Sequence, residues 1–158
     1  NRWLSRCQKG SKNRQKVIMK IQRVNEKIRN IRKHLIHNIT TKIVKENDLI
    51  SIEKLKVKEM ITNSNKTLTK LLTNSSLKEI IRQLKYKSIW QNKKIIEVNT
   101  YYPSSQICNH CGERNKNLSL DIRKWECRKC HNELDRDINA SINIMYEGLM
   151  NYMKGQIV

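Results

Sequence analysis

The chain has 158 residues, which is about the length of one globular domain with a modest core. Its 33 Lys and Arg residues outnumber its 14 acidic residues, and the formal net charge of +19 exceeds what solubility requires. This charge favours a polyanionic partner, with nucleic acid as the leading candidate. No apolar run approaches the roughly 18 residues of a membrane span and no signal-peptide pattern opens the chain, so we expect a soluble, intracellular protein with no membrane partner.

Positive charge is concentrated in the first third of the chain. Residues 1–47 hold 14 Lys and Arg residues against Glu26 and Glu46, and so carry +12 of the total +19. A solvated helix face explains any single charge in this segment, but not the whole cluster. We predict that the segment binds nucleic acid. The residues expected to contact nucleic acid are Lys9, Lys12, Arg14 and Lys16.

The first predicted element is a long helix. Apolar residues recur at steps of three or four from Val17 to Ile43, which is helical periodicity. The pattern predicts one helix, or two with a bend near residues 37–41, whose apolar stripe packs in a core rather than in a coiled-coil dimer. Residues 6–16 contain Gly, Ser, Asn and dense charge without periodicity, which predicts a basic loop or extended arm.

Two strands enclose a second helix. Residues 49–55 form a short, mostly apolar run that is typical of a strand of five to seven residues, and residues 94–99 predict another strand. Between them, residues 61–75 are rich in Ser, Thr and Asn, as loops are. The order strand, helix, strand favours an α/β body over a helical bundle.

Two further helices have recognisable first turns. Ser76 and Glu79 match a capping box, which predicts a helix that ends near residues 91–93. Asp135 or Asp137 can cap the last helix of the chain, because a carboxylate at a helix N-terminus accepts hydrogen bonds from free N–H groups. The predicted core face of that last helix is Ile138, Ile142, Met145 and Leu149.

Four cysteines have metal-site spacing, C-x2-C-x15-C-x2-C, at Cys108, Cys111, Cys127 and Cys130. Each pair can form a short knuckle, and the spacer lets the two knuckles face each other around a tetrahedral ion. Two disulfides are the alternative, but the absence of secretory features indicates a reducing compartment, where thiolates bind zinc. Four thiolates leave no open coordination position, so the predicted zinc is structural.

The remaining chemistry-bearing residues have ordinary alternatives. We expect His110 and His131 to be surface residues rather than ligands, and Cys7 to be an unpaired thiol. Glu53 lies at the carboxyl end of a predicted strand, the edge of an α/β sheet where ligands usually bind, although an exposed Glu beside Lys54 is the simpler interpretation.

A combination of motifs resembles one known family. A turn at Tyr102-Pro103-Ser104-Ser105 precedes the first cysteine pair, Trp125-Glu126 precedes the second, and the chain then reads DRDINASINI over residues 135–144. With LSRCQKGSKNRQK and ISIEKLKVKEM upstream, this resembles the C-terminal half of the TnpB (OrfB) family of transposon-encoded proteins, relatives of type V CRISPR nucleases. The resemblance covers nearly the whole chain and implies RNA-guided, metal-dependent cleavage of DNA.

The resemblance also implies a catalytic site. In such nucleases three carboxylates hold two Mg²⁺ ions, and the motifs place Glu53 on the family's second acid and Asp137 on its third. The first acid, which precedes the basic arm in the family, has no counterpart, because no Asp occurs before Asp48. A second departure is Lys54, where the family commonly has Asp.

The resemblance implies an α/β fold that is a partial RuvC-like (RNase H-type) domain with a zinc ribbon. The expected boundaries are residues 1–105 for the partial domain with its long N-terminal helix, 106–133 for the ribbon and 134–158 for the returning helix. Two functions stay open at this point. The chain is either the C-terminal part of an RNA-guided DNA endonuclease whose partners are DNA and guide RNA, or a catalytically incomplete zinc-ribbon protein that binds nucleic acid.

Overall fold

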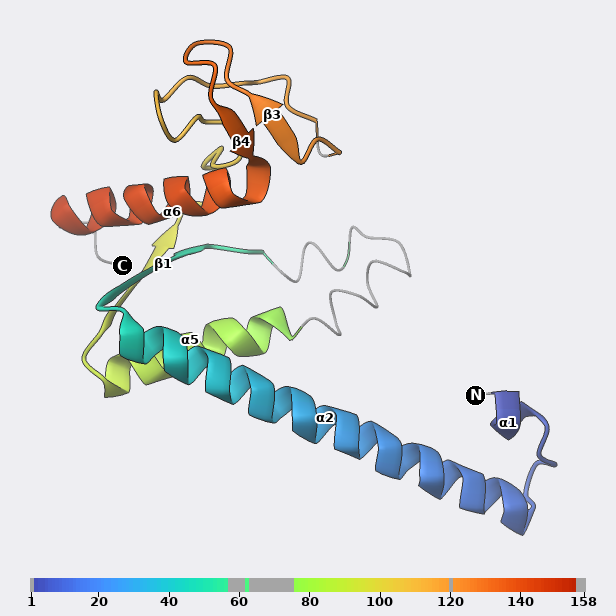
Figure 1. Cartoon of the computed structure of the whole chain (residues 1–158). Coiled ribbons are helices and arrows are strands. Elements are labelled where there is room, and N and C mark those ends of the chain that lie inside the picture. Colours follow the sequence, from blue (N-terminus) through green and yellow to red (C-terminus); the bar gives the residue numbers. More distant parts are fainter. Residues whose placement is uncertain (1, 57–61, 63–75, 120, 156–158) are drawn as a thin grey trace. The chain divides into compact units, whose positions relative to one another are not determined.

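A computed structural model describes residues 2–56, 62, 76–119 and 121–155, and the chain divides into two compact units, Asn1–Lys42 and Ile43–Val158 (Figure 1). No helix in these described ranges combines the length and the apolar character needed to cross a bilayer. The elements in chain order are α1 (Arg2–Ser5), α2 (Lys12–Glu46), β1 (Leu49–Glu53), α5 (Leu77–Trp90), β2 (Lys94–Val98), β3 (Lys124–Glu126), β4 (Glu133–Asp135) and α6 (Arg136–Met153). The predicted boundaries at residues 105 and 133 stay predictions.

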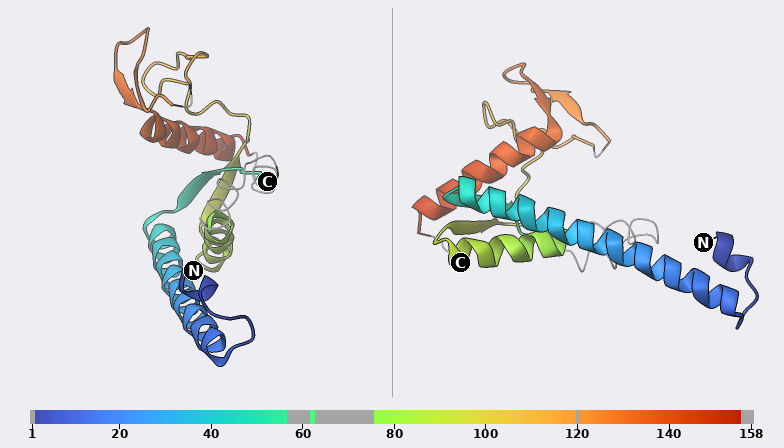
Figure 2. Two further views of the ribbon diagram at one scale, coloured as in Figure 1. Left: turned by 90° about the vertical axis from the view of Figure 1, so that its right-hand side faces the viewer. Right: turned by 60° about the horizontal axis from the view of Figure 1, so that its bottom comes forward.

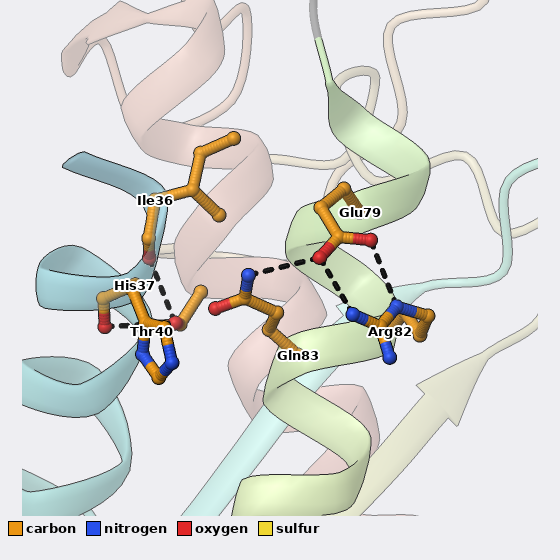
Figure 3. Close-up of polar contacts among 6 residues, drawn as sticks. All are labelled: Ile36, His37, Thr40, Glu79, Arg82 and Gln83. Atoms are coloured by element: carbon orange, nitrogen blue, oxygen red, sulfur yellow. Dashed lines mark hydrogen bonds and ion pairs between the residues drawn. The ribbon is translucent and has the colours of Figure 1, made fainter. Parts of the chain in front are cut away.

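Helix α2 is one continuous helix of 35 residues, so the first of the two predictions, one helix without a break near residues 37–41, is confirmed. Its start at Lys12 makes the prediction of a loop wrong for residues 12–16, because Ser11 Oγ accepts a hydrogen bond from Arg14 N at 3.2 Å and caps the first turn. Thr40 does not break the helix, since its hydroxyl donates to the carbonyl of Ile36 at 2.8 Å (Figure 3).

The apolar stripe of α2 is largely exposed. Val17 and Ile36 are buried, but Val24, Ile28, Ile31, Leu35 and Ile39 keep between 47% and 59% of their surface exposed. The expectation of core packing is therefore wrong for the middle of the stripe. Periodicity identifies which residues share a helix face, but it does not supply the surface against which that face packs.

The unit Ile43–Val158 is built on a parallel pair of strands. β1 pairs with β2 in the register Leu49↔Lys94 to Glu53↔Val98, and α5 connects them, which confirms the predicted strand-helix-strand order. The two strands lie between α5 and α6 (Figures 1 and 2). The core on the α5 side is formed by Val44, Ile50 and Leu84, with partly buried Ile43, Ile52, Ile80 and Ile95 around them.

The start of α5 differs from the predicted capping box. Ser76 has a left-handed backbone (φ 56°) and its side chain makes no capping hydrogen bond. Glu79 instead accepts hydrogen bonds from Arg82 at 2.7 and 2.8 Å and from Gln83 at 2.9 Å (Figure 3). The capping box is wrong because the carboxylate is committed to side chains further along its own helix. The loop predicted over residues 61–75 lies outside the described residues except at Thr62.

The buried face of α6 is polar and small rather than aliphatic. Its buried residues are Asn139, Asn143 and Gly148. The predicted core face is wrong at three of its four positions, because Ile138, Met145 and Leu149 are 62%, 50% and 38% exposed. Gly148 permits a close approach to β1, since a Cβ built there would lie 2.0 Å from Ser51 Oγ.

The two asparagines join α6 to the segment that leads into the first cysteine pair. Asn139 Nδ2 donates to Ile107 O at 2.7 Å, and Asn139 Oδ1 accepts from Asn109 N at 2.9 Å. Asn143 Nδ2 donates to Ser104 O at 2.8 Å and to Ile107 O at 2.7 Å. Residues 104–109 therefore have a fixed place on α6.

We expect Gly148→Ala to lower the free energy of unfolding by about 1–2 kcal/mol in urea titrations. Alanine in a helix normally gains about 1 kcal/mol over glycine, but here the overlap with Ser51 outweighs that gain. In a double-mutant cycle, Ser51→Gly should relieve the cost of Gly148→Ala. A Gly148→Ala protein that is more stable than the parent would contradict the close packing of α6 on β1.

Candidate functional site

Four sulfur atoms gather in the cysteine module, which we define as residues 106–135. The Sγ atoms of Cys108, Cys111, Cys127 and Cys130 all lie within 4.8 Å of one another. The distance is 3.6 Å between the Sγ atoms of Cys108 and Cys130, and 3.5 Å between those of Cys111 and Cys127. Sulfurs at about 2.3 Å from a tetrahedral zinc ion would lie about 3.8 Å apart. The cluster therefore has the dimensions of a tetrathiolate site and could hold a metal ion.

Each cysteine pair is shaped by a turn that ends in a left-handed residue. In the first turn, Gly112 N donates to Cys108 O at 2.9 Å, and Gly112 has a φ of 75°. In the second, His131 N donates to Cys127 O at 2.9 Å, and His131 has a φ of 58°. Glycine adopts this conformation freely, whereas a residue with a Cβ loses roughly 1–2 kcal/mol. The two knuckles thus share a backbone shape although their sequences differ.

The sulfurs differ in acidity. Backbone N–H groups of Cys130 and Lys129 lower the pKa of Cys127 to about 6, against the opposing effect of burial. Burial raises the pKa of Cys108. The backbone N–H of Glu113 acts to lower the pKa of Cys111, but burial and the three neighbouring thiols outweigh it and raise this pKa to about 12. Backbone N–H groups therefore favour the thiolate at Cys127, while burial favours the protonated thiol at Cys108 and Cys111.

The same geometry decides between the alternatives that the sequence leaves open. All five cysteines are free, and the sulfur separations in the cluster far exceed the bond of about 2.05 Å in a disulfide. His110 and His131 are exposed surface residues, as expected, and Nδ1 of His131 lies 2.9 Å from Glu126 Oε1. Cys7 lies outside the cluster, and its thiol donates to Trp3 O at 3.4 Å.

Glu53 is the last residue of β1, as predicted, and pairs in register with Val98 at the end of β2. Side chains alternate along a strand, so Glu53 shares a sheet face with Ser51. Ser51 contacts α6 through the carbonyl of Met145 at 3.5 Å, so this is the face that α6 covers. Glu53 is half-buried, and no residue in the described ranges forms a hydrogen bond or ion pair with its side chain.

The capping role at the start of α6 belongs to Asp135. Its Oδ1 accepts hydrogen bonds from Asp137 N at 3.0 Å and Ile138 N at 3.1 Å, and these N–H groups lower the pKa of Asp135. Asp137 lies in the first turn with 79% of its side chain exposed, 3.5 Å from Nε of the adjacent Arg136. Because Asp135 satisfies the helix end, the carboxylate of Asp137 is left facing solvent.

The four basic residues predicted to contact nucleic acid fall around the start of α2. Lys9, Lys12 and Lys16 are exposed, Lys9 in the loop and the other two on the helix. Arg14 has a structural task, because its Nη1 donates to the carbonyls of Leu4 at 3.0 Å and Cys7 at 3.4 Å. Nucleic-acid contact by these residues stays a prediction.

Sequence reasoning did not identify Asn139 and Asn143, although both are almost fully buried. Their spacing of four residues places them on one helix face, which is a detectable signal. Buried amides at such spacing indicate carbonyl partners from another segment, because an unpaired buried amide is costly.

Comparison with known proteins covers most of the chain. The family model described as "Probable transposase" matches residues 1–64, and the one described as "Cas12f1-like, TNB domain" matches residues 78–144. A solved structure described as a Cas12f1-sgRNA-target DNA complex matches 84% of this chain and 38% of its own chain, with a TM-score of 0.58 and 22% identity. That likeness concerns the fold, a mixture of helix and sheet with a cysteine cluster.

Two relatives are described as candidate RNA-guided DNA endonucleases. The one from Streptomyces pristinaespiralis is 34% identical over 146 residues, and the one from Escherichia coli strain K12, InsQ, is 34% identical over 160 residues. The matches cover 92% and 93% of this chain but only 36% and 40% of those relatives, so the chain spans about two fifths of their length. With both family models and these relatives in agreement, the chain belongs to the TnpB (OrfB) family of transposon-encoded proteins.

Proposed function

We propose that this chain forms the C-terminal part of an RNA-guided DNA endonuclease with a metal-dependent site of the RuvC type. The observation that carries the proposal is the position of Glu53, a half-buried carboxylate with no partner among the described residues, on the sheet face that α6 covers. The relatives described as candidate RNA-guided DNA endonucleases support the same activity, with DNA and a guide RNA as partners.

The path of the chain supports a meeting of Glu53 and Asp137. β1 and β2 are parallel, so Glu53 and Val98 end at the same edge of the sheet. Six residues beyond Val98, the Ser104 carbonyl accepts a hydrogen bond from Asn143, within the same helix that begins beside Asp137. This hydrogen bond holds the N-terminal half of α6 against the segment that follows β2 at this edge of the sheet. Two carboxylates there could share Mg²⁺, which would supply an activated water and stabilise the leaving oxygen.

Asp48 is excluded as a substitute for the missing first acid at this edge. It precedes β1, at the opposite end of the strand from Glu53, and its carboxylate forms an ion pair with Lys93, which precedes β2. The same ion pair lowers the pKa of Asp48. A third carboxylate for the proposed site must therefore come from a residue other than Asp48.

The cysteine module fits a structural zinc ion held by Cys108, Cys111, Cys127 and Cys130, with no open position for water. Residues 106–133 would then be a zinc ribbon inserted before the helix that presents Asp137. The second candidate function, nucleic-acid binding without cleavage, is favoured by the exposed Lys9, Lys12 and Lys16.

We expect zinc binding to release at least two protons at pH 7, because Cys108 and Cys111 have raised pKa values and must ionise. The affinity should fall by at least about 100-fold for each pH unit of acidification near neutrality, and more steeply below pH 6 as Cys127 also becomes protonated. Calorimetric titration in buffers of different ionisation enthalpy measures the released protons.

The matched pair for this titration is Cys127→Ser and Cys7→Ser. Cys127→Ser should abolish stoichiometric zinc binding and unfold the cysteine module while helix α2 stays intact, and Cys7→Ser should change nothing because Cys7 lies outside the cluster. Zinc that binds without proton release, or a loss of zinc in Cys7→Ser, would refute the tetrathiolate site.

Catalysis can be tested in a fusion. The segment of the Streptomyces pristinaespiralis relative that precedes its match would be joined to residues 1–158, and guided cleavage of plasmid DNA measured with Mg²⁺. Asp137→Ala and Glu53→Ala should each reduce cleavage by at least 100-fold, since even outer-shell partners of a metal cost about 10- to 100-fold. The unfused chain should show negligible cleavage.

Asp48→Asn is the matched carboxylate control, because Asp48 lies at the other end of β1 and should keep activity. Cleavage that survives Asp137→Ala would remove the assigned site. A folded fusion that binds guide RNA but does not cut would instead favour the nucleic-acid-binding function.

A further inference from the structure

A cavity of about 290 Å³ lies in the unit Asn1–Lys42, between α1 and the first three turns of α2. Its wall combines Trp3 with three cations, Lys16, Lys20 and Arg23. The cations are spaced at four and three residues, which places them along one face of α2. The volume is at the lower limit for ligand pockets, so the cavity suits a group no larger than one nucleotide.

Hydrogen bonds hold the segment that forms the wall of the cavity, α1 and the turn after it, in place against α2. Arg14 Nη1 donates to the carbonyls of Leu4 and Cys7, which holds α1 and its following turn against α2. Gly10 has a φ of 81°, so the chain reverses there through a conformation that favours glycine. Ser11 then caps α2. These contacts position Trp3 relative to the helix.

Trp3 is an unusual surface residue. It is 63% exposed, and Lys20 Nζ lies 5.3 Å from the centroid of its ring. A large exposed indole has a flat π-face for stacking, and the neighbouring ammonium supplies charge for a phosphate at the same place. The indole can stack on the base of a nucleotide, and the cations can contact its phosphate. An acidic peptide would contact the cations but would leave the indole without a stacking partner.

We propose that this cavity binds an unpaired nucleotide of a single-stranded nucleic acid, with the base stacked on Trp3 and the phosphates beside Lys16, Lys20 and Arg23. The inference rests on the nucleic-acid binding in the proposed function and names where one nucleotide is held. Bases within a duplex are stacked on each other and do not reach an indole at the protein surface, so the site selects single strands.

The experiment titrates the 158-residue protein with a single-stranded RNA dodecamer, the same sequence of DNA, the matching duplex and a dodecamer of abasic nucleotides. Binding is followed by intrinsic tryptophan fluorescence and by anisotropy of a labelled strand. Both single strands with bases should quench the fluorescence, and the abasic strand should bind roughly 5- to 100-fold more weakly. Trp3→Leu should weaken binding of the base-containing strand by a similar factor and leave the abasic strand unaffected.

Trp3→Phe should restore part of the affinity, since a phenyl ring still stacks. The matched control is Trp90→Phe, because Trp90 is also exposed, at 77%, but lies on α5 in the other unit. Trp90→Phe should leave the affinity for the single strands unchanged, and the bound strand should still quench the fluorescence of Trp3. Equal binding of the abasic and base-containing strands, an unchanged affinity in Trp3→Leu, or equal competition by polyglutamate would overturn the stacking site. If the abasic strand still binds well, general nucleic-acid binding stands and only the stacking site fails.

Discussion

Two buried amide side chains hold the helix that carries Asp137 against the segment that follows β2. Asn139 and Asn143 satisfy the backbone of residues 104–109, so the first cysteine knuckle, the chain leaving β2 and the start of α6 are held together. An apolar residue at either position would leave buried carbonyls unpaired, at about 1–3 kcal/mol each. The polar face of α6 is therefore its packing face, which explains why its aliphatic residues stay exposed. Asp137 lies two residues before Asn139, so the hydrogen bonds that position this end of the helix also position the backbone of Asp137.

Acidic groups are few in a chain with a net charge of +19, and several of them pair with a cation. Asp48 pairs with Lys93, Glu79 with Arg82, and Glu97 with Lys85. Glu53 has no such partner in the described ranges, whereas Asp137 is largely exposed and forms an ion pair of 3.5 Å with the adjacent Arg136. In the proposed site the two carboxylates would share a divalent cation, which would remove the repulsion between them.

Local patterns in the sequence predicted the elements better than their packing. The order of strand, helix and strand, the four-cysteine cluster and the position of Glu53 at a strand end followed from short-range spacing and were confirmed. The capping box at Ser76 failed because Arg82 and Gln83 compete for the Glu79 carboxylate. The predictions of which faces of α2 and α6 are buried were wrong, because burial depends on the surface that lies opposite each face. For α6, the partners of Asn139 on that surface lie 30 or more residues away in the chain. The four-residue spacing of Asn139 and Asn143 marks a shared helix face, but it does not identify the distant segment that the face contacts.

Hydrogen exchange of the backbone amides, with zinc bound and after chelation, tests the central claim that the cysteine module and the start of α6 form one cooperative unit. The amide of Asn109, which donates to Asn139 Oδ1, reports the link itself. We expect chelation to speed exchange at Asn109 and in the first two turns of α6 together, while the paired amides of β1 and β2 stay protected. If the module loses protection and the start of α6 does not, the cysteine module does not hold the helix that carries Asp137.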